Sequence, residues 1–218
     1  FRSINLHVAH IDLLRSIGES RSINYLEVGP PGVGKTTMIK AVASQLGLPV
    51  FVVNPKTVNS FSLKEMLNPT CSNGYQGMIL VLFEDFDRFL TNHNDMSGLL
   101  NALDGFDDRY NVVRICTGND TQLVRSTPAL LNRMTRIFEF YYPTEEHYDA
   151  KFQFLIQKCK VPAPDPKLYR QFLDKVTAIP RLTLRPYTKY VIRHILNSSF
   201  SGNSDYMEAM LENIEQLE

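Results

Sequence analysis

The feature that most constrains the fold is a glycine-rich run between an apolar stretch and a helical pattern. The run Gly29-Pro30-Pro31-Gly32-Val33-Gly34-Lys35-Thr36 fits G-x-x-x-x-G-K-[ST] and follows the apolar segment 23–28. Glycines let the backbone curl so that its N–H groups converge on phosphate oxygens, and the N-terminus of the next helix favours an anion. In such a loop, Lys35 reaches the β- and γ-phosphates and Thr36 is a ligand for Mg²⁺. The predicted contacts with ATP come from the loop and the residue after it: Gly29, Pro30, Pro31, Gly32, Val33, Gly34, Lys35, Thr36 and Thr37.

Short apolar strands alternate with helical patterns as far as residue 141. The predicted strands are 23–28, 50–54, 78–83, 112–117 and 136–141. They show little polar alternation, as expected of strands that are covered on both faces. Helices are predicted after the loop, where an apolar stripe runs from Met38 to Leu46, and over 63–67, 96–103 and 127–131. This alternation predicts an α/β fold, a three-layer αβα arrangement around a parallel sheet, of the P-loop NTPase kind.

The pattern changes at Pro143, after which only helices are predicted. Thr144 can cap a helix that runs to about Cys159, and the proline-rich segment 161–166 then interrupts the chain. Three more helices are predicted, over 167–176, 184–196 and 205–217. We therefore predict a nucleotide-binding αβα domain at 1–143 and a small all-α lid domain at 144–218.

Composition narrows the class of protein. Lys+Arg and Asp+Glu both number 23, so the formal net charge is zero and nucleic-acid binding is not indicated by charge. The three cysteines Cys71, Cys116 and Cys159 form no C-x-x-C pair, which argues against a zinc site. We expect free thiols in an intracellular, reducing compartment, the cytoplasm before an organelle. No apolar run is long enough to cross a bilayer.

A second motif lies where the apolar strand 79–83 ends in two carboxylates, Glu84 and Asp85. Ligands of parallel α/β sheets bind at the carboxyl ends of the strands, so these acids should face the phosphate loop. Carboxylates at that place can hold Mg²⁺ and orient an attacking water. Alone, the run also fits a solvated turn; together with the loop, it favours a catalytic role.

With these motifs, residues 24–141 resemble the core of the AAA+ ATPases, and the run Ser97-Gly98-Leu99-Leu100-Asn101-Ala102-Leu103-Asp104-Gly105 is similar to that of AAA remodellers. The usual order of the acidic pair in this family is Asp then Glu, and this chain has the reverse. The reversed order resembles that of the AAA chaperones of the mitochondrial inner membrane that handle the Rieske iron–sulfur protein. By position, the resemblance implies that Glu84 lies on the metal side and that Asp85 polarises the water. The side chain of Asp85 is one methylene shorter than the Glu that is usual at this position, which affects how far its carboxylate reaches and the rate of hydrolysis.

The resemblance extends to three further positions. Asn119 matches the polar residue of the sensor-1 strand, which implies a hydrogen bond to the γ-phosphate or to the attacking water. The segment 128–136 resembles the one that bears arginine fingers, although the usual spacer and one arginine are missing. Arg133 is therefore the first candidate for the finger and Arg136 the second. Arg185 resembles a sensor-2 residue, which contacts the nucleotide in cis.

Each of these residues also has a plainer interpretation: a turn for Asn119, a surface ion pair for Arg133, and a solvated helix residue for Arg185. Phe61, in the segment 58–62, lies where ring ATPases line their pore, but packing before a helix explains it equally well. A finger acts on the nucleotide of a neighbour, so the resemblance implies self-association into a ring, with six subunits favoured.

The leading hypothesis is an oligomeric ATPase that couples hydrolysis of ATP with Mg²⁺ to remodelling or threading of a macromolecule, by preference a protein. A DNA-replication clamp loader or helicase loader of the same superfamily is the first alternative. A P-loop kinase of small molecules fits less well, because the series of acidic pair, Asn119 and Arg133 is not expected there. A nucleotide-dependent assembly module without turnover is the non-enzymatic alternative.

Overall fold

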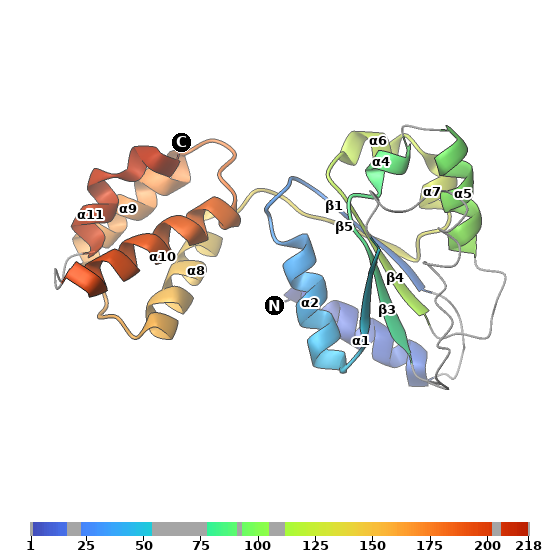
Figure 1. Ribbon diagram of the computed structural model, residues 1–218, viewed down its shortest axis with the longest axis horizontal. Coiled ribbons are helices and arrows are strands. Elements are labelled where there is room, and N and C mark those ends of the chain that lie inside the picture. The colour runs from blue at the N-terminus through green and yellow to red at the C-terminus, as the bar shows by residue number, and fades with distance from the viewer. Residues whose placement is uncertain are drawn as a thin grey trace. The chain divides into compact units, whose positions relative to one another are not determined.

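The structure is a computed structural model that describes residues 2–16, 23–53, 78–90, 93–104, 112–201 and 206–217 (Figure 1). The chain divides into two units. The first comprises Phe1–Pro30 and Lys35–Phe140, and the second Pro31–Gly34 and Tyr141–Glu218. The predicted helix at 63–67 and Phe61 lie outside the described residues.

A five-stranded sheet forms the centre of the first unit. Its strands are β1 (Ile23–Val28), β2 (Val50–Val53), β3 (Ile79–Phe83), β4 (Val112–Gly118) and β5 (Arg136–Glu139). They lie in the order β2-β3-β4-β1-β5, and every pairing is parallel. Residues of β1, β3 and β4 are buried throughout, and β3 is accordingly apolar along its whole length, whereas β1 and β4 each also bury two polar side chains. The parallel α/β prediction is confirmed, and the carboxyl ends of β1, β3 and β4 meet at one edge.

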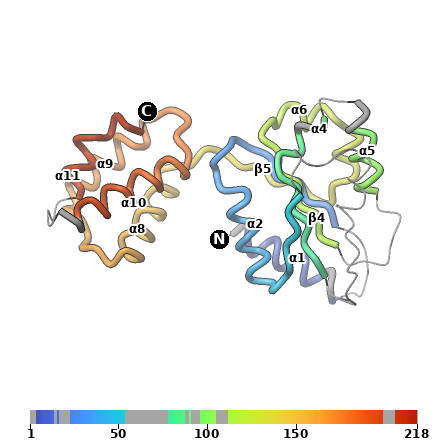
Figure 2. The backbone as a smooth tube through the Cα atoms, in the orientation of Figure 1, coloured from blue at the N-terminus to red at the C-terminus, as the bar shows by residue number. Residues whose placement is uncertain are grey.

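Helices cover both faces of this sheet, which completes the three layers. The helices of the unit are α1 (Arg2–Ser16), α2 (Lys35–Leu46), α4 (Asp87–Leu90), α5 (His93–Asp104), α6 (Thr121–Arg125) and α7 (Pro128–Leu131). One core packs α1 and α2 against one face of the sheet, and these two helices lie side by side in the backbone trace of Figure 2. The other core packs α4, α5, α6 and α7 against the opposite face. Neighbouring strand residues therefore face different cores, as with Leu80 and Val81.

The second unit is helical from residue 145 onward. It contains α8 (Glu145–Cys159), α9 (Pro166–Ala178), α10 (Leu184–Ser201), α11 (Tyr206–Glu212) and the 3₁₀ helix η1 (Ile214–Leu217). Asp165 caps α9, because its side chain accepts hydrogen bonds from the backbone N–H groups of Lys167 and Leu168. The helix predicted over 205–217 is divided, since η1 follows α11. Within the part of the chain that the structure describes, no helix is both long and apolar enough to span a membrane.

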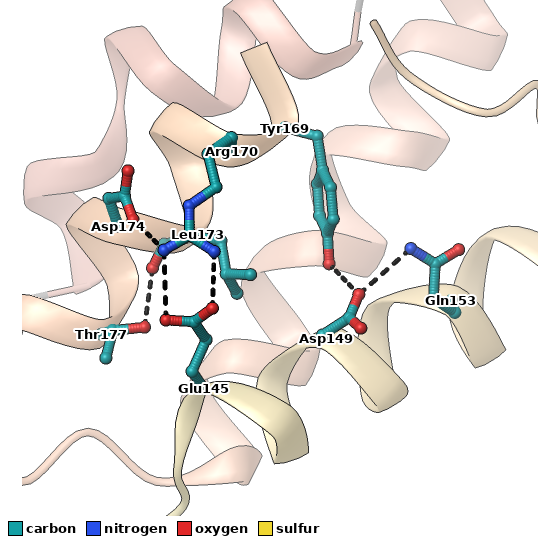
Figure 3. A network of polar contacts seen from close by, with 8 residues as sticks. All are labelled: Glu145, Asp149, Gln153, Tyr169, Arg170, Leu173, Asp174 and Thr177. Carbon is teal, nitrogen blue, oxygen red and sulfur yellow. Dashed lines mark hydrogen bonds and ion pairs between the residues drawn. The ribbon is translucent and has the colours of Figure 1, made fainter. Parts of the chain in front are cut away.

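Aromatic side chains form the core of the helical unit, among them Phe152, Phe172 and Tyr187. Polar contacts join α8 to α9 at the surface (Figure 3). Arg170 pairs with Glu145 and with Asp174, each at 2.6 Å, and the Tyr169 hydroxyl donates to Asp149 Oδ1 at 2.6 Å. The exposed pairs contribute little to stability, so the apolar core is the main source of stability in this unit.

Candidate nucleotide-binding site

The phosphate loop leaves β1 at Gly29 and enters α2 at Lys35. Glycine is required at Gly29, because a Cβ there would lie 2.2 Å from the Phe140 carbonyl oxygen. Gly34 has a φ of +108°, a backbone conformation that side chains disfavour. The Gly29 N–H also donates to the Gly118 carbonyl at 3.2 Å, which ties the start of the loop to the end of β4.

Lys35 is nearly buried, with 8% of its surface exposed. Its ammonium donates to the carbonyl oxygens of Gly29 at 2.6 Å and Pro30 at 2.9 Å, and to Asn119 Oδ1 at 2.9 Å. The structure therefore brings together two residues that are far apart in sequence, Lys35 and Asn119. Their contact lies at the carboxyl ends of β1 and β4, where the loop pattern predicts the phosphates.

Thr36 and Glu84 supply a pair of neighbouring oxygens at the same edge. The Thr36 hydroxyl donates to Glu84 Oε1 at 2.7 Å. A hydroxyl and a carboxylate are oxygen donors that suit Mg²⁺, so these residues fit the predicted ion. Among the described residues, no group of three or more His, Cys, Asp or Glu side chains is placed to hold a metal ion.

Asp85 lies beside Asn119, whose Nδ2 donates to Asp85 Oδ1 at 2.9 Å. Its backbone has a φ of +49°, in the left-handed region that few residues other than glycine adopt. The Asp85 N–H donates to the Thr117 hydroxyl at 3.3 Å, and the next N–H, that of Phe86, donates to the Thr117 carbonyl at 2.9 Å. These bonds to β4 hold the turn after β3, so an unfavourable backbone conformation coincides with the predicted water-polarising residue.

Two residues at this edge escaped the sequence analysis as functional candidates, Thr117 and Asp87. Asp87 Oδ2 accepts hydrogen bonds from the backbone N–H groups of Asn119 at 2.8 Å and Asp120 at 2.9 Å. It thereby fixes the backbone of the sensor-1 position. In the sequence, Asp87 is a third acid close behind Glu84 and Asp85, and this position was the signal that could have identified it.

A buried carboxylate, Glu27, lies one residue before the end of β1 and was also missed, because that strand was treated as apolar. Both Glu27 and His7 of α1 are fully buried, and His7 Nε2 lies 3.5 Å from Glu27 Oε1. Burial raises the pKa of Glu27, while His7 and Lys35 act in the opposite direction. His7 also stacks on Phe138 of β5 with ring centroids 3.8 Å apart. Glu27 is thus a buried carboxyl next to His7, and its burial disfavours the charged form.

The two candidate arginines of the first unit, Arg133 and Arg136, make their contacts outside this cluster. Arg133 pairs with Asp104 through its Nε at 2.7 Å, and also donates to the Ala129 carbonyl at 2.7 Å. The guanidinium carbon of Arg136 lies over the Phe138 ring, 5.3 Å from the centre of the ring. Arg185 is exposed in the first turn of α10, in the helical unit. The roles of all three arginines stay predictions.

Comparison with known proteins bears on the family of this chain. The AAA family, described as the ATPase family associated with various cellular activities, matches residues 25–142. The AAA-ATPase At5g40000 of Arabidopsis thaliana is 29% identical over 160 residues, which cover 62% of this chain and 33% of that protein. The 26S proteasome regulatory subunit 6A of Schizosaccharomyces pombe is 30% identical over 166 residues, which cover 67% of this chain and 37% of that protein. The probable mitochondrial chaperone BCS1-A of Dictyostelium discoideum is 29% identical over 120 residues, which cover 47% of this chain and 27% of that protein.

Among solved structures, a RuvB variant of Thermotoga maritima superposes with a TM-score of 0.71 at 19% identity, over 97% of this chain and 68% of that one. At this identity, the likeness concerns the fold alone. The chain spans well under half the length of the three curated relatives. The family match nevertheless covers more than half of the chain and includes the loop, the acidic pair and Asn119. This chain therefore belongs to the AAA family of ATPases, whose activity is the hydrolysis of ATP.

Proposed function

We propose that the chain binds Mg·ATP at the loop and hydrolyses it within an oligomeric ring that remodels or threads a macromolecule, by preference a protein. The observation that carries the proposal is the continuous series of contacts from Lys35 through Asn119 to Asp85. It joins a phosphate-binding lysine to a carboxylate suited to orient water. The Thr36–Glu84 contact lies on the same strand ends.

Each residue of the cluster has a defined task in this proposal. The loop amides and Lys35 bind the β- and γ-phosphates, and Thr36 and Glu84 would hold Mg²⁺, which neutralises charge on the phosphates. Asn119 and Asp85 orient the attacking water, with Asp85 as the acceptor of its hydrogen bond. A neighbouring subunit contributes Arg133, since a guanidinium at the γ-phosphate stabilises the charge of the transition state.

The preference for a protein substrate is supported by relatives that are named as a probable chaperone and as proteasome regulatory subunits. The zero net charge also speaks against a DNA-replication loader, which needs a basic surface for phosphates. Primed DNA separates the two: we expect no stimulation of the ATPase rate, whereas stimulation favours the loader.

The central test mixes two inactive variants. Lys35→Ala should abolish ATP binding, and Arg133→Ala should bind ATP normally but hydrolyse it about 10³-fold more slowly. Mixed rings contain sites that combine an intact Lys35 from one subunit with an intact Arg133 from the next. We therefore expect the mixture to recover part of the activity that each variant lacks alone.

The controls are each variant at the total protein concentration of the mixture, and the particle mass with a non-hydrolysable ATP analogue. Absence of recovery in rings shown to contain both variants would refute a finger acting in trans. Unchanged ATP affinity in Lys35→Ala contradicts the assignment of the loop itself.

A further inference from the structure

The amide side chain of Asn24, in β1, makes three hydrogen bonds inside the protein, and both of its N–H donors are used. Only 5% of the residue is exposed. Its Nδ2 donates to the carbonyl of Leu103 at 3.1 Å and to the carbonyl of Arg133 at 3.0 Å. Its Oδ1 accepts a hydrogen bond from Arg114 Nη1 at 3.1 Å. One side chain therefore connects the end of α5, the segment after α7, and β4.

The main chain of Asn24 binds the same segment. Its N–H donates to the Thr135 hydroxyl at 3.2 Å, and its carbonyl accepts from the Thr135 N–H at 2.7 Å. Asn24 thus contacts both Arg133 and Thr135, on either side of Met134. The short segment that carries the candidate finger is held at two points by one residue of the sheet.

Arg114 determines which way the Asn24 amide faces. The two residues are direct partners in the β1–β4 register, and Arg114 is 2% exposed. Burial lowers the pKa of Arg114 to about 10, so the guanidinium is charged at neutral pH. A guanidinium only donates hydrogen bonds, so the amide oxygen must face Arg114. The amide nitrogen is consequently directed at the two carbonyls.

These two carbonyls belong to the backbone on both sides of one ion pair. Leu103 immediately precedes Asp104, and the Asp104 carboxylate pairs with the Arg133 guanidinium at 2.7 Å. By bonding Leu103 and Arg133, Asn24 fixes the distance between the two main-chain segments from which the paired side chains extend. The direction of the Arg133 side chain therefore depends on Asn24.

We infer that Asn24 is a positioning residue for Arg133, oriented in turn by Arg114. The inference rests on the proposed function, in which Arg133 reaches the γ-phosphate of a neighbouring subunit. Asn24 lies about 16 Å along β1 from Gly29, at the opposite end of the strand from the loop, so it does not touch the nucleotide of its own subunit. Its effect should therefore appear in turnover and not in ATP affinity.

The test replaces Asn24 by a residue of the same shape. Asn24→Asp keeps an oxygen for Arg114 but removes both N–H donors. We expect kcat to fall by about 10- to 100-fold, because small displacements of a catalytic group have effects of that size. The affinity for a non-hydrolysable ATP analogue should stay unchanged. In an Arg133→Ala background, the same replacement should cause no further loss, since both changes act through one group.

Two further variants separate positioning from general damage. Val113→Ala removes a buried side chain next to Arg114 that faces the other core, so it should lower the unfolding temperature without the loss of kcat. The double variant Asn24→Leu/Arg114→Leu replaces the buried polar pair by apolar groups. It should fold and still show the reduced kcat, which covers the case in which Asn24→Asp fails to fold.

The outcomes distinguish this inference from the proposed function. If Arg133→Ala lowers kcat but neither Asn24 variant does, the inference is overturned, while the assignment of Arg133 as the arginine finger is retained. A loss from Asn24→Asp that is equally large in the Arg133→Ala background also overturns it. An unchanged kcat in Arg133→Ala refutes the role of Arg133 as the arginine finger, and with it the role of Asn24 as its positioning residue.

Discussion

Replacement of Asp87 by alanine should destabilise the first unit and slow hydrolysis together. The Asp87 carboxylate accepts two backbone hydrogen bonds, from Asn119 at 2.8 Å and from Asp120 at 2.9 Å. Both are charge-assisted, and Asp87 is 9% exposed. Without the carboxylate, the segment after β4 loses its attachment to α4, and the Asn119 side chain loses its fixed position between Lys35 and Asp85.

The magnitude follows from these two bonds. Each hydrogen bond to a charged group contributes about 1.5–3 kcal/mol, and water can reach the partly buried donors, so the lower end applies. We expect Asp87→Ala to lower the free energy of unfolding by about 3 kcal/mol. Asp87→Asn keeps an acceptor oxygen but no charge, and should cost about half as much. Asp174→Ala, which removes one partner of an exposed ion pair with Arg170, should stay within about 0.5 kcal/mol.

Urea unfolding of the three variants gives these differences, and ATPase assays well below the unfolding transition give kcat. The order of destabilisation should be Asp87→Ala, then Asp87→Asn, then Asp174→Ala, and kcat should fall in the two Asp87 variants only. If Asp87→Ala costs no more than Asp174→Ala, the two backbone bonds do not stabilise the site and the reasoning is refuted.

Three other replacements test separate parts of the structure. Asp85→Asn should bind ATP with unchanged affinity but hydrolyse it about 10²- to 10⁴-fold more slowly in single-turnover assays; turnover equal to the parent moves the role to another residue. The raised pKa of Glu27 means that its contribution to stability is complete below the unfolded value of 4.5 and is lost as pH rises through the folded value. Glu27→Gln should therefore gain stability relative to the parent by about 1.4 kcal/mol per pH unit across that window, and a difference independent of pH contradicts this. Tyr169→Phe removes the bond to Asp149 and should cost about 1 kcal/mol in thermal unfolding, whereas an unchanged transition shows that the bond adds nothing.

The sequence predicts the central strands well because strands that are buried on both faces are rich in apolar and β-branched residues, most completely in β3. The prediction for β1 matches the observed strand, while the predicted last strand extends two residues beyond β5, which ends at Glu139. Helix α1 was not predicted, and the order of the strands was not either. The position of α1 and the order of the strands both depend on which surfaces of the chain pack together. Local sequence patterns do not directly determine this packing.

The residues of the candidate site divide in the same way. Lys35, Thr36 and the acidic pair follow from patterns in which a side chain has a chemical task of its own. Asp87 and Asn24 act by accepting from or donating to backbone groups of distant segments. Any polar side chain at those positions looks like a cap or a solvated residue in sequence, so only the folded chain reveals them.

The hydrogen bonds that the Lys35 ammonium donates within the protein have a consequence for recognition of the nucleotide. A triphosphate that engages this lysine must replace contacts to Gly29, Pro30 and Asn119, so binding is an exchange of partners rather than the capture of an anion by a bare cation. In the proposed function, the same exchange would release the Asn119 carboxamide oxygen from Lys35 when the γ-phosphate binds. We therefore expect binding of a phosphate at Lys35 to be coupled to the position of the Asn119 side chain through this one hydrogen bond.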